Sequence, residues 1–128
     1  MTNAPASLVR GVFRVPTAAQ RLTMYIGEAD RWQNQPLYEA IVLKARELHM
    51  AGATVLRGPM GFGADSRIHT SKILRLSEDL PIVVEIVDSP GKIAELLPHL
   101  EQMVKKGLVA VEDVRVHIYN PQGSTAGA

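Results

Sequence analysis

The stretch "PIVVEIVDSPGKIAELLPHLEQMV", Pro81 to Val104, contains a complete strand and a complete helix in succession. Its first eight residues are rich in β-branched side chains, which favour strands. Within them the apolar residues Ile82, Val84 and Ile86 alternate with Val83, Glu85 and Val87. Both sets are largely apolar, so the pattern predicts a strand in the centre of a sheet.

A helix is expected directly after this strand. Ser89 followed by Pro90 is typical of a helix N-cap and first turn. Apolar side chains then recur at the helical period, at Ile93, Leu96, Leu97, Leu100, Met103 and Val104. Pro98 should kink the helix because it lacks an N–H group, and Lys105, Lys106 and Gly107 suit its C-terminal end.

Three further strands and one further helix are expected around this pair. Apolar and polar residues alternate over 20–27 and over 114–119, which predicts two half-buried strands. A third strand is expected over 53–58. After Pro36 the apolar residues Leu37, Ile41, Ala45 and Leu48 follow the helical period up to Gly52.

The predicted order is strand, helix, strand, strand, helix, strand. This order is typical of the ferredoxin-like split βαβ sandwich, an α+β fold in which two helices cover one face of a four-stranded antiparallel sheet. We expect a flexible arm over 1–19, this domain over 20–119 and a flexible tail over 120–128. The uncovered sheet face would carry Thr23, Tyr25, Val83, Val87 and either Val55 or Leu56. Oligomerisation would remove such an apolar face from water.

Composition narrows the class of protein. The 128 residues carry 14 Lys and Arg against 13 Asp and Glu, so no basic excess points to nucleic acid as a partner. The absence of cysteine excludes disulfides, zinc–thiolate sites and thiol catalysis. No apolar stretch reaches the length of a signal peptide core or a membrane span, and we expect a cytoplasmic protein.

The segment "RGPMGFGADSRIHTSK", Arg57 to Lys72, has two interpretations. Its glycines could expose backbone N–H groups to phosphate oxygens, with Arg67 as a bidentate donor. They could equally be turn residues in a surface loop. The spacing matches neither a Walker motif nor a dinucleotide fingerprint, so the residues alone leave both open.

A second polar segment, "GEADRW", follows the first predicted strand. Glu28 and Asp30 could bind a hard cation or act as acid and base, or they could lie in a solvated turn near the first helix. Trp32 could stack on an adenine ring or anchor the loop to the helix behind it. The four histidines lie on separate elements without metal-binding spacing, and His69 stands out only through its loop.

The chain from Leu22 to Tyr119 resembles the DUF190 family, which is grouped with the PII-like signalling proteins. The motifs "YIGEADRW", "QPLYEAIVLKARELHMAGATVLRG", "GFGADSRIHTSKILRLSEDLPIVVEIVDS" and "GLVAVEDVRVHIY" carry the resemblance. It implies a homotrimer with ligands in clefts between subunits, and a T-loop that contacts partner proteins. Gly61 to Gly63, His69 and Thr70 resemble the base of that loop.

The resemblance also implies an effector. PII proteins sense adenine nucleotides, and they bind the phosphates with a second glycine- and lysine-rich loop before the last strand. Here that connection reads "KKGLVAVEDVRV", with a single glycine. AMP or ADP is therefore expected as effector, bound at least as tightly as ATP.

We expect a regulatory sensor, not an enzyme, with no metal and no cofactor other than the AMP or ADP effector. Family members are often encoded beside transport genes, which points to a membrane transporter as a partner. The expected ligand-binding residues are Glu28, Asp30, Gly58, Gly61, Phe62, Gly63, Arg67, His69 and Thr70. Two alternatives are a trimer that binds a cation or anion, similar to the divalent-cation tolerance proteins, and an enzyme that uses Glu28 or Asp30 with His69 between subunits.

Overall fold

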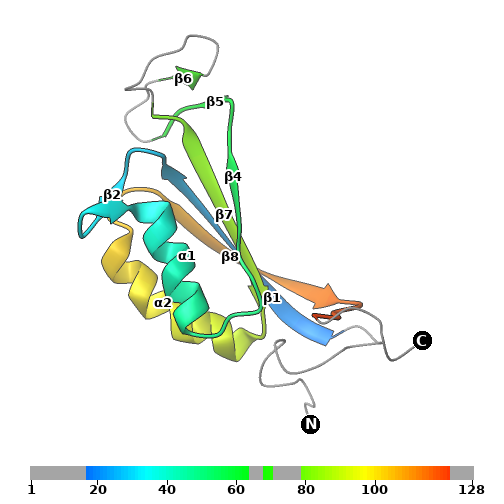
Figure 1. Cartoon of the computed structure of the whole chain (residues 1–128). Coiled ribbons are helices and arrows are strands. Elements are labelled where there is room, and N and C mark those ends of the chain that lie inside the picture. The colour runs from blue at the N-terminus through cyan, green and yellow to red at the C-terminus, as the bar shows by residue number, and fades with distance from the viewer. Residues whose placement is uncertain (1–16, 64–67, 71–78, 122–128) are drawn as a thin grey trace.

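The computed structural model describes residues 17–63, 68–70 and 79–121, with only the backbone of His69 and Thr70. A four-stranded sheet lies behind two helices that cover one of its faces (Figure 1). The strands of this sheet are β1 (Thr17–Gly27), β4 (Thr54–Arg57), β7 (Pro81–Asp88) and β8 (Leu108–Val116), in the order β4-β7-β1-β8. The helices are α1 (Leu37–Glu47) and α2 (Pro90–Met103). All neighbouring strands are antiparallel, which confirms the predicted ferredoxin-like split βαβ sandwich.

The core lies between the sheet and the helices. In β1 and β7 the register places Leu22 opposite Ile86 and Met24 opposite Val84, and all four side chains are buried. Ile41 of α1 and other apolar residues of both helices pack onto this layer. The alternation seen in the sequence therefore correctly identifies the covered face.

The start of α2 also matches the prediction. Ser89 is the N-cap, its hydroxyl accepts the Lys92 N–H at 3.3 Å, and Pro90 is the first helical residue. The Lys92 ammonium donates to the Leu48 carbonyl at 2.5 Å, just after α1. This contact satisfies a terminal carbonyl of α1 and ties the end of one helix to the start of the other.

The prediction of the last strand was wrong in its position. It was expected over 114–119, whereas β8 runs from Leu108 to Val116. Most of the stretch that was interpreted as a connection is therefore strand, and only Val104 to Gly107 separates α2 from β8. Residues 108–111 are all apolar and all exposed, because β8 lies at the sheet edge and neither of its faces is fully covered. An apolar run without alternation does not signal a half-buried strand. The first strand also differs from its prediction. Strand β1 begins at Thr17, three residues before the predicted start.

Two short ladders project from the sandwich. Strands β2 (Arg31–Trp32) and β3 (Gln35–Pro36) form a hairpin before α1. Strands β5 (Met60–Gly61) and β6 (His69–Thr70) pair beyond the end of β4 (Figure 1). The glycine-rich segment therefore has an ordered base.

The uncovered sheet face carries an apolar row that crosses all four strands. Leu56 lies opposite Val83, Val83 opposite Tyr25, and Tyr25 opposite Leu108. Val55 lies opposite Val84 and packs against the core, so Leu56 is the residue that belongs to the uncovered face.

Among the described residues no helix is long and apolar enough to cross a membrane.

Candidate functional site

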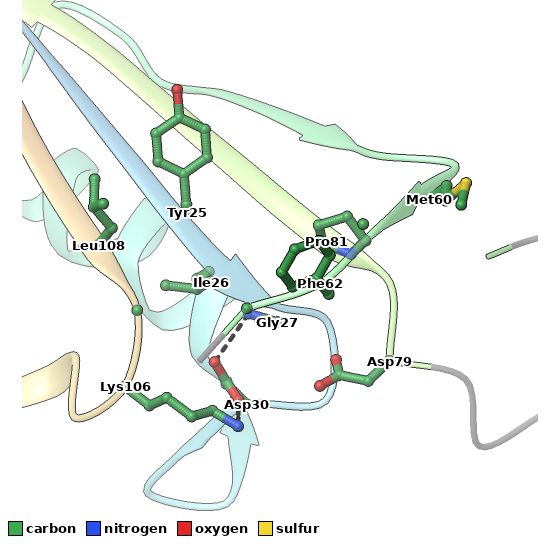
Figure 2. Close-up of a pocket in the computed structure, with 13 residues that line it drawn as sticks. Tyr25, Ile26, Gly27, Asp30, Met60, Phe62, Asp79, Pro81, Lys106 and Leu108 are labelled. Carbon is green, nitrogen blue, oxygen red and sulfur yellow. Dashed lines mark hydrogen bonds and ion pairs between the residues drawn. The ribbon is translucent and has the colours of Figure 1, made fainter. Parts of the chain in front are cut away.

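A cavity of about 570 Å³ lies where β1 ends and where β7 and β8 begin. Tyr25, Phe62 and Pro81 contribute to its apolar wall, and Asp30, Asp79 and Lys106 contribute its charges (Figure 2). The remaining lining residues are Ile26, Gly27, Met60, Gly61, Gly63, Gly107 and Leu108.

Strand register brings these distant segments together. Gly27 at the end of β1 pairs with Pro81 at the start of β7, and Tyr25 pairs with Leu108 at the start of β8. The chain that enters β7 and the chain that enters β8 therefore flank the turn that leaves β1. Strand ends at one edge of a sandwich are a common place for a binding site.

The turn after β1 is fixed by two aspartates. Asp30 Oδ2 accepts the Gly27 N–H at 2.9 Å, and the Asp30 carbonyl accepts the N–H of Leu37, the first residue of α1, at 2.8 Å. Asp79 Oδ1 accepts the Ala29 N–H at 2.7 Å from the other side. A Cβ on Gly27 would lie only 2.8 Å from both Asp79 carboxylate oxygens. Glycine at position 27 therefore allows Asp79 to approach the turn.

The glycines of the loop segment have different roles. A Cβ on Gly58 or Gly61 would lie 2.8 or 2.9 Å from Cγ of Pro81, so both glycines make room for the proline ring. The Gly58 N–H donates to the Pro81 carbonyl at 2.8 Å. Gly63 meets nothing within 4 Å and lines the cavity. Close packing explains the first two glycines, and only Gly63 is sterically open.

Of the nine residues expected from the sequence, four line the cavity: Asp30, Gly61, Phe62 and Gly63. Glu28 and Gly58 lie outside it, and the Glu28 carboxylate pairs with Arg57 at 2.5 Å. His69 and Thr70 are placed only as the β6 backbone opposite β5. Arg67 lies outside the described residues. An acid–base pair of Glu28 with His69 stays a prediction, because the His69 side chain lies outside the described part of the structure.

Sequence reasoning missed Asp79 as a lining residue and considered Lys106 mainly as a helix cap. Lys106 lies beyond the end of α2, and its Nζ is 3.9 Å from Asp30 Oδ1. Asp79 lies 50 residues from Ala29, its hydrogen-bond partner. The sequence held one signal that Asp79 belongs to the site. Asp79 lies just before a strand predicted to be central, and such a residue must lie at an end of the sheet.

Other candidates from the sequence have structural explanations. Trp32 is half-buried and packs against the core, which supports its role as an anchor for the hairpin. Within the described ranges, no three His, Asp or Glu side chains gather as a metal site would require.

A second hollow, of about 400 Å³, lies at the opposite end of the sheet. Thr54, Glu85 and Tyr119 supply its polar groups, beside apolar and backbone surface from 51–53, Val87 and Val116. Burial, and after it the negative charge of Asp88, raises the pKa of the Tyr119 phenol above its ordinary value of 10.0. Asp88 itself is fully buried and accepts the N–H groups of Ala51 at 2.8 Å and Ser89 at 2.7 Å.

Two solved structures share this architecture. Both are of CPII from Thiomonas intermedia K12, which is described as a nitrogen regulatory PII-like protein. The form bound to ADP and bicarbonate has a TM-score of 0.62 and 16% sequence identity, over 81% of this chain and 93% of the CPII chain. The form bound to ADP, AMP and bicarbonate has a TM-score of 0.60 and 17% identity, over 81% and 92%. The fold is therefore PII-like.

Sequence relatives identify the family. A UPF0166 protein of Aquifex aeolicus is 34% identical over 74% of this chain and 90% of its own length. A UPF0166 protein of Methanocaldococcus jannaschii is 32% identical over 77% of this chain and 92% of its own length. The model of the DUF190 family, described as an uncharacterized ACR, matches residues 19–116. The chain therefore belongs to the DUF190 family.

Proposed function

We propose that this chain is a PII-like regulatory sensor that binds an adenine nucleotide, AMP or ADP, in the cavity at the end of β1. One observation carries the proposal: the cavity joins an aromatic and apolar wall to a charged end that includes an ammonium group. A nucleotide has the matching division into an apolar ring and a charged tail. The nucleotides in the CPII structures support this choice of ligand class.

The apolar wall offers a surface for the base. Phe62 is 66% exposed although it lines the cavity, whose wall it shares with Pro81 (Figure 2). An exposed aromatic ring at the mouth of a cavity can stack on a purine. Lys106 and the backbone at Gly63 and Gly107 would receive the phosphate.

We propose further that three copies form a ring through the uncovered sheet face. The cavity and the second hollow lie at opposite ends of this sheet. In a ring of head-to-tail contacts, the hollow of one copy could face the cavity of the next. Thr54, Glu85 and Tyr119 of the neighbour would then complete the site.

The signal would leave through the chain between Gly58 and Asp79. Its base, at Met60 to Gly63, lines the cavity, so a bound nucleotide would contact it directly. A ligand shifts such a segment only by binding one of its states more tightly. The proposed recipient is a partner protein such as a membrane transporter.

Calorimetric titration with adenosine, AMP, ADP, ATP and GMP tests the proposal. AMP and ADP should bind at least as tightly as ATP, and GMP should bind more weakly. Phe62→Ala should weaken AMP binding by about 1–3 kcal/mol if the ring stacks on the base. Ile118→Ala is the matched control, because Ile118 is 63% exposed and does not line the cavity. No binding of any adenine nucleotide at millimolar concentration would refute the proposal.

A further inference from the structure

The charges at the polar end of the cavity do not match a highly phosphorylated ligand. Among the described lining residues, Asp30 and Asp79 supply two carboxylates and Lys106 the only ammonium. Lys106 Nζ lies 3.9 Å from Asp30 Oδ1, so this cation is already partly neutralised. From the described lining residues, a phosphate that enters here meets more negative than positive charge.

Asp30 cannot move away to relieve this conflict. Its Oδ2 accepts the Gly27 N–H at 2.9 Å, and its backbone bonds to Gly27 and Leu37 on both sides of the turn. Its side chain is only 17% exposed, so solvent screens its charge less than that of a surface carboxylate. Within the described part of the chain, Lys106 makes one long ion-pair contact, and its side chain is 58% exposed, so it can turn toward a ligand.

Asp79 is drawn on the other side of Gly27 from Lys106 (Figure 2), and the ion pair that the described residues give Lys106 is with Asp30. Asp79 Oδ1 is occupied by the Ala29 N–H at 2.7 Å. Asp30 is therefore the carboxylate that competes with a phosphate for the ammonium group.

From this geometry we infer that Asp30 is a specificity-determining residue that limits how many phosphate groups the cavity accepts. The inference rests on the proposed nucleotide binding. The first phosphate takes Lys106 from Asp30, and each further phosphate adds charge near a fixed carboxylate, with no second cation among the described lining residues to balance it. Ligands with few phosphates are favoured for this reason.

Asp30→Asn tests this inference, because the amide oxygen can still accept the Gly27 N–H while the negative charge is removed. Affinities for adenosine, AMP, ADP and ATP are measured at low salt, with EDTA and with Mg²⁺. In EDTA we expect adenosine binding to change by less than about twofold, and AMP binding to tighten about threefold and ATP about tenfold or more. The gain should shrink at high salt.

Asp113→Asn is the matched control. This exposed carboxylate lies in β8 away from the cavity, where it accepts the Gln20 amide at 3.3 Å. Asp113→Asn changes the net charge by the same amount as Asp30→Asn and should leave all four affinities unchanged. Lys106→Met should act in the opposite direction to Asp30→Asn, weakening AMP, ADP and ATP while sparing adenosine.

Two results would overturn the inference while the proposed function stands. An equal change for adenosine and its phosphates in Asp30→Asn would mean that Asp30 acts on the nucleoside or on the turn. If this variant binds ADP and ATP more weakly only when Mg²⁺ is present, Asp30 binds a metal ion. A wild-type protein that binds none of the four ligands would instead remove the proposed function and this inference with it.

Discussion

Gly107 has a backbone conformation that residues with a side chain rarely adopt, with a φ of +140°. A Cβ here would lie 2.7 Å from the Tyr25 carbonyl oxygen, at the end of the pairing between β1 and β8. Both the conformation and the close approach require glycine. The same residue lines the cavity, so the fold and the candidate site share one constraint.

Gly107→Ala should therefore lower the free energy of unfolding by about 1–3 kcal/mol, measured by urea denaturation at fixed protein concentration. Gly91→Ala is the control, because Gly91 lies in α2 and a Cβ there meets nothing within 4 Å. That variant should be as stable as wild type or slightly more stable, since alanine favours helix. Equal stability of the two variants would contradict the argument.

Single residues also mark the limit of sequence-based prediction of the site. Asp30, Gly61, Phe62 and Gly63 could be found because they lie in two local segments with a visible pattern. Lys106 and Asp79 could not be assigned, because only the strand register brings them to the turn after β1. Their place next to a predicted strand or helix end is the one local signal, and it does not identify the distant residues that they contact.

At the scale of elements, the alternation of side chains located β7 correctly and misplaced β8. β7 alternates between buried and partly buried positions along its whole length and was predicted with its observed bounds. β8 has no such alternation over 108–111, because it is an edge strand. Its predicted position was consequently six residues too late at the start.

The end of β7 is linked to the segment after β8 through Asp88 and Tyr119. The Tyr119 hydroxyl donates to the Ala51 carbonyl at 3.5 Å, and the Asp88 carboxylate accepts the Ala51 N–H. Burial and the charge of Asp88 raise the pKa of Tyr119 above 10.0. The folded protein thus holds this proton to higher pH than the unfolded chain does. Below pH 10 Tyr119 is protonated in both the folded and the unfolded states. Above pH 10 the unfolded chain loses this proton first, which lowers the free energy of unfolding.

An alkaline titration of the phenolate absorbance checks this link. The wild-type protein should show a tyrosine that titrates above pH 10, and Tyr119→Phe should remove it. Asp88→Asn should lower the pKa of Tyr119 toward its ordinary value. Tyr25→Phe, the control, should leave the shifted transition in place. Loss of that transition in Tyr25→Phe but not in Tyr119→Phe would show that the assignment is wrong.

At the scale of the whole molecule, the uncovered face of the sheet is the feature that the isolated chain does not explain. The apolar row of Leu56, Val83, Tyr25 and Leu108 crosses the sheet from one edge to the other. A continuous apolar row on an open sheet is typical of an interface. This observation supports the proposed trimer.

Light scattering at micromolar concentration should give about three times the chain mass of 14.0 kDa. Leu56→Asp should dissociate the assembly, because a carboxylate buried in an apolar interface costs several kcal/mol. Leu43→Asp is the matched control: Leu43 in α1 is 53% exposed, against 54% for Leu56, but lies away from the open sheet face. A monomeric wild-type protein would remove the basis for a shared site.

The short β5–β6 ladder has a consequence for how this domain can change over evolution. Because Met60 and Gly61 pair with Thr70 and His69, the chain between them begins and ends at one fixed point. When the ends of a loop are already held together, doubling its length costs only about 0.6 kcal/mol in closure entropy. Insertions and deletions beyond Gly63, the last residue of this segment known to line the cavity, would leave the sandwich and the cavity almost untouched. New binding specificities for other proteins could therefore arise in this segment while the pocket beside it keeps its ligand.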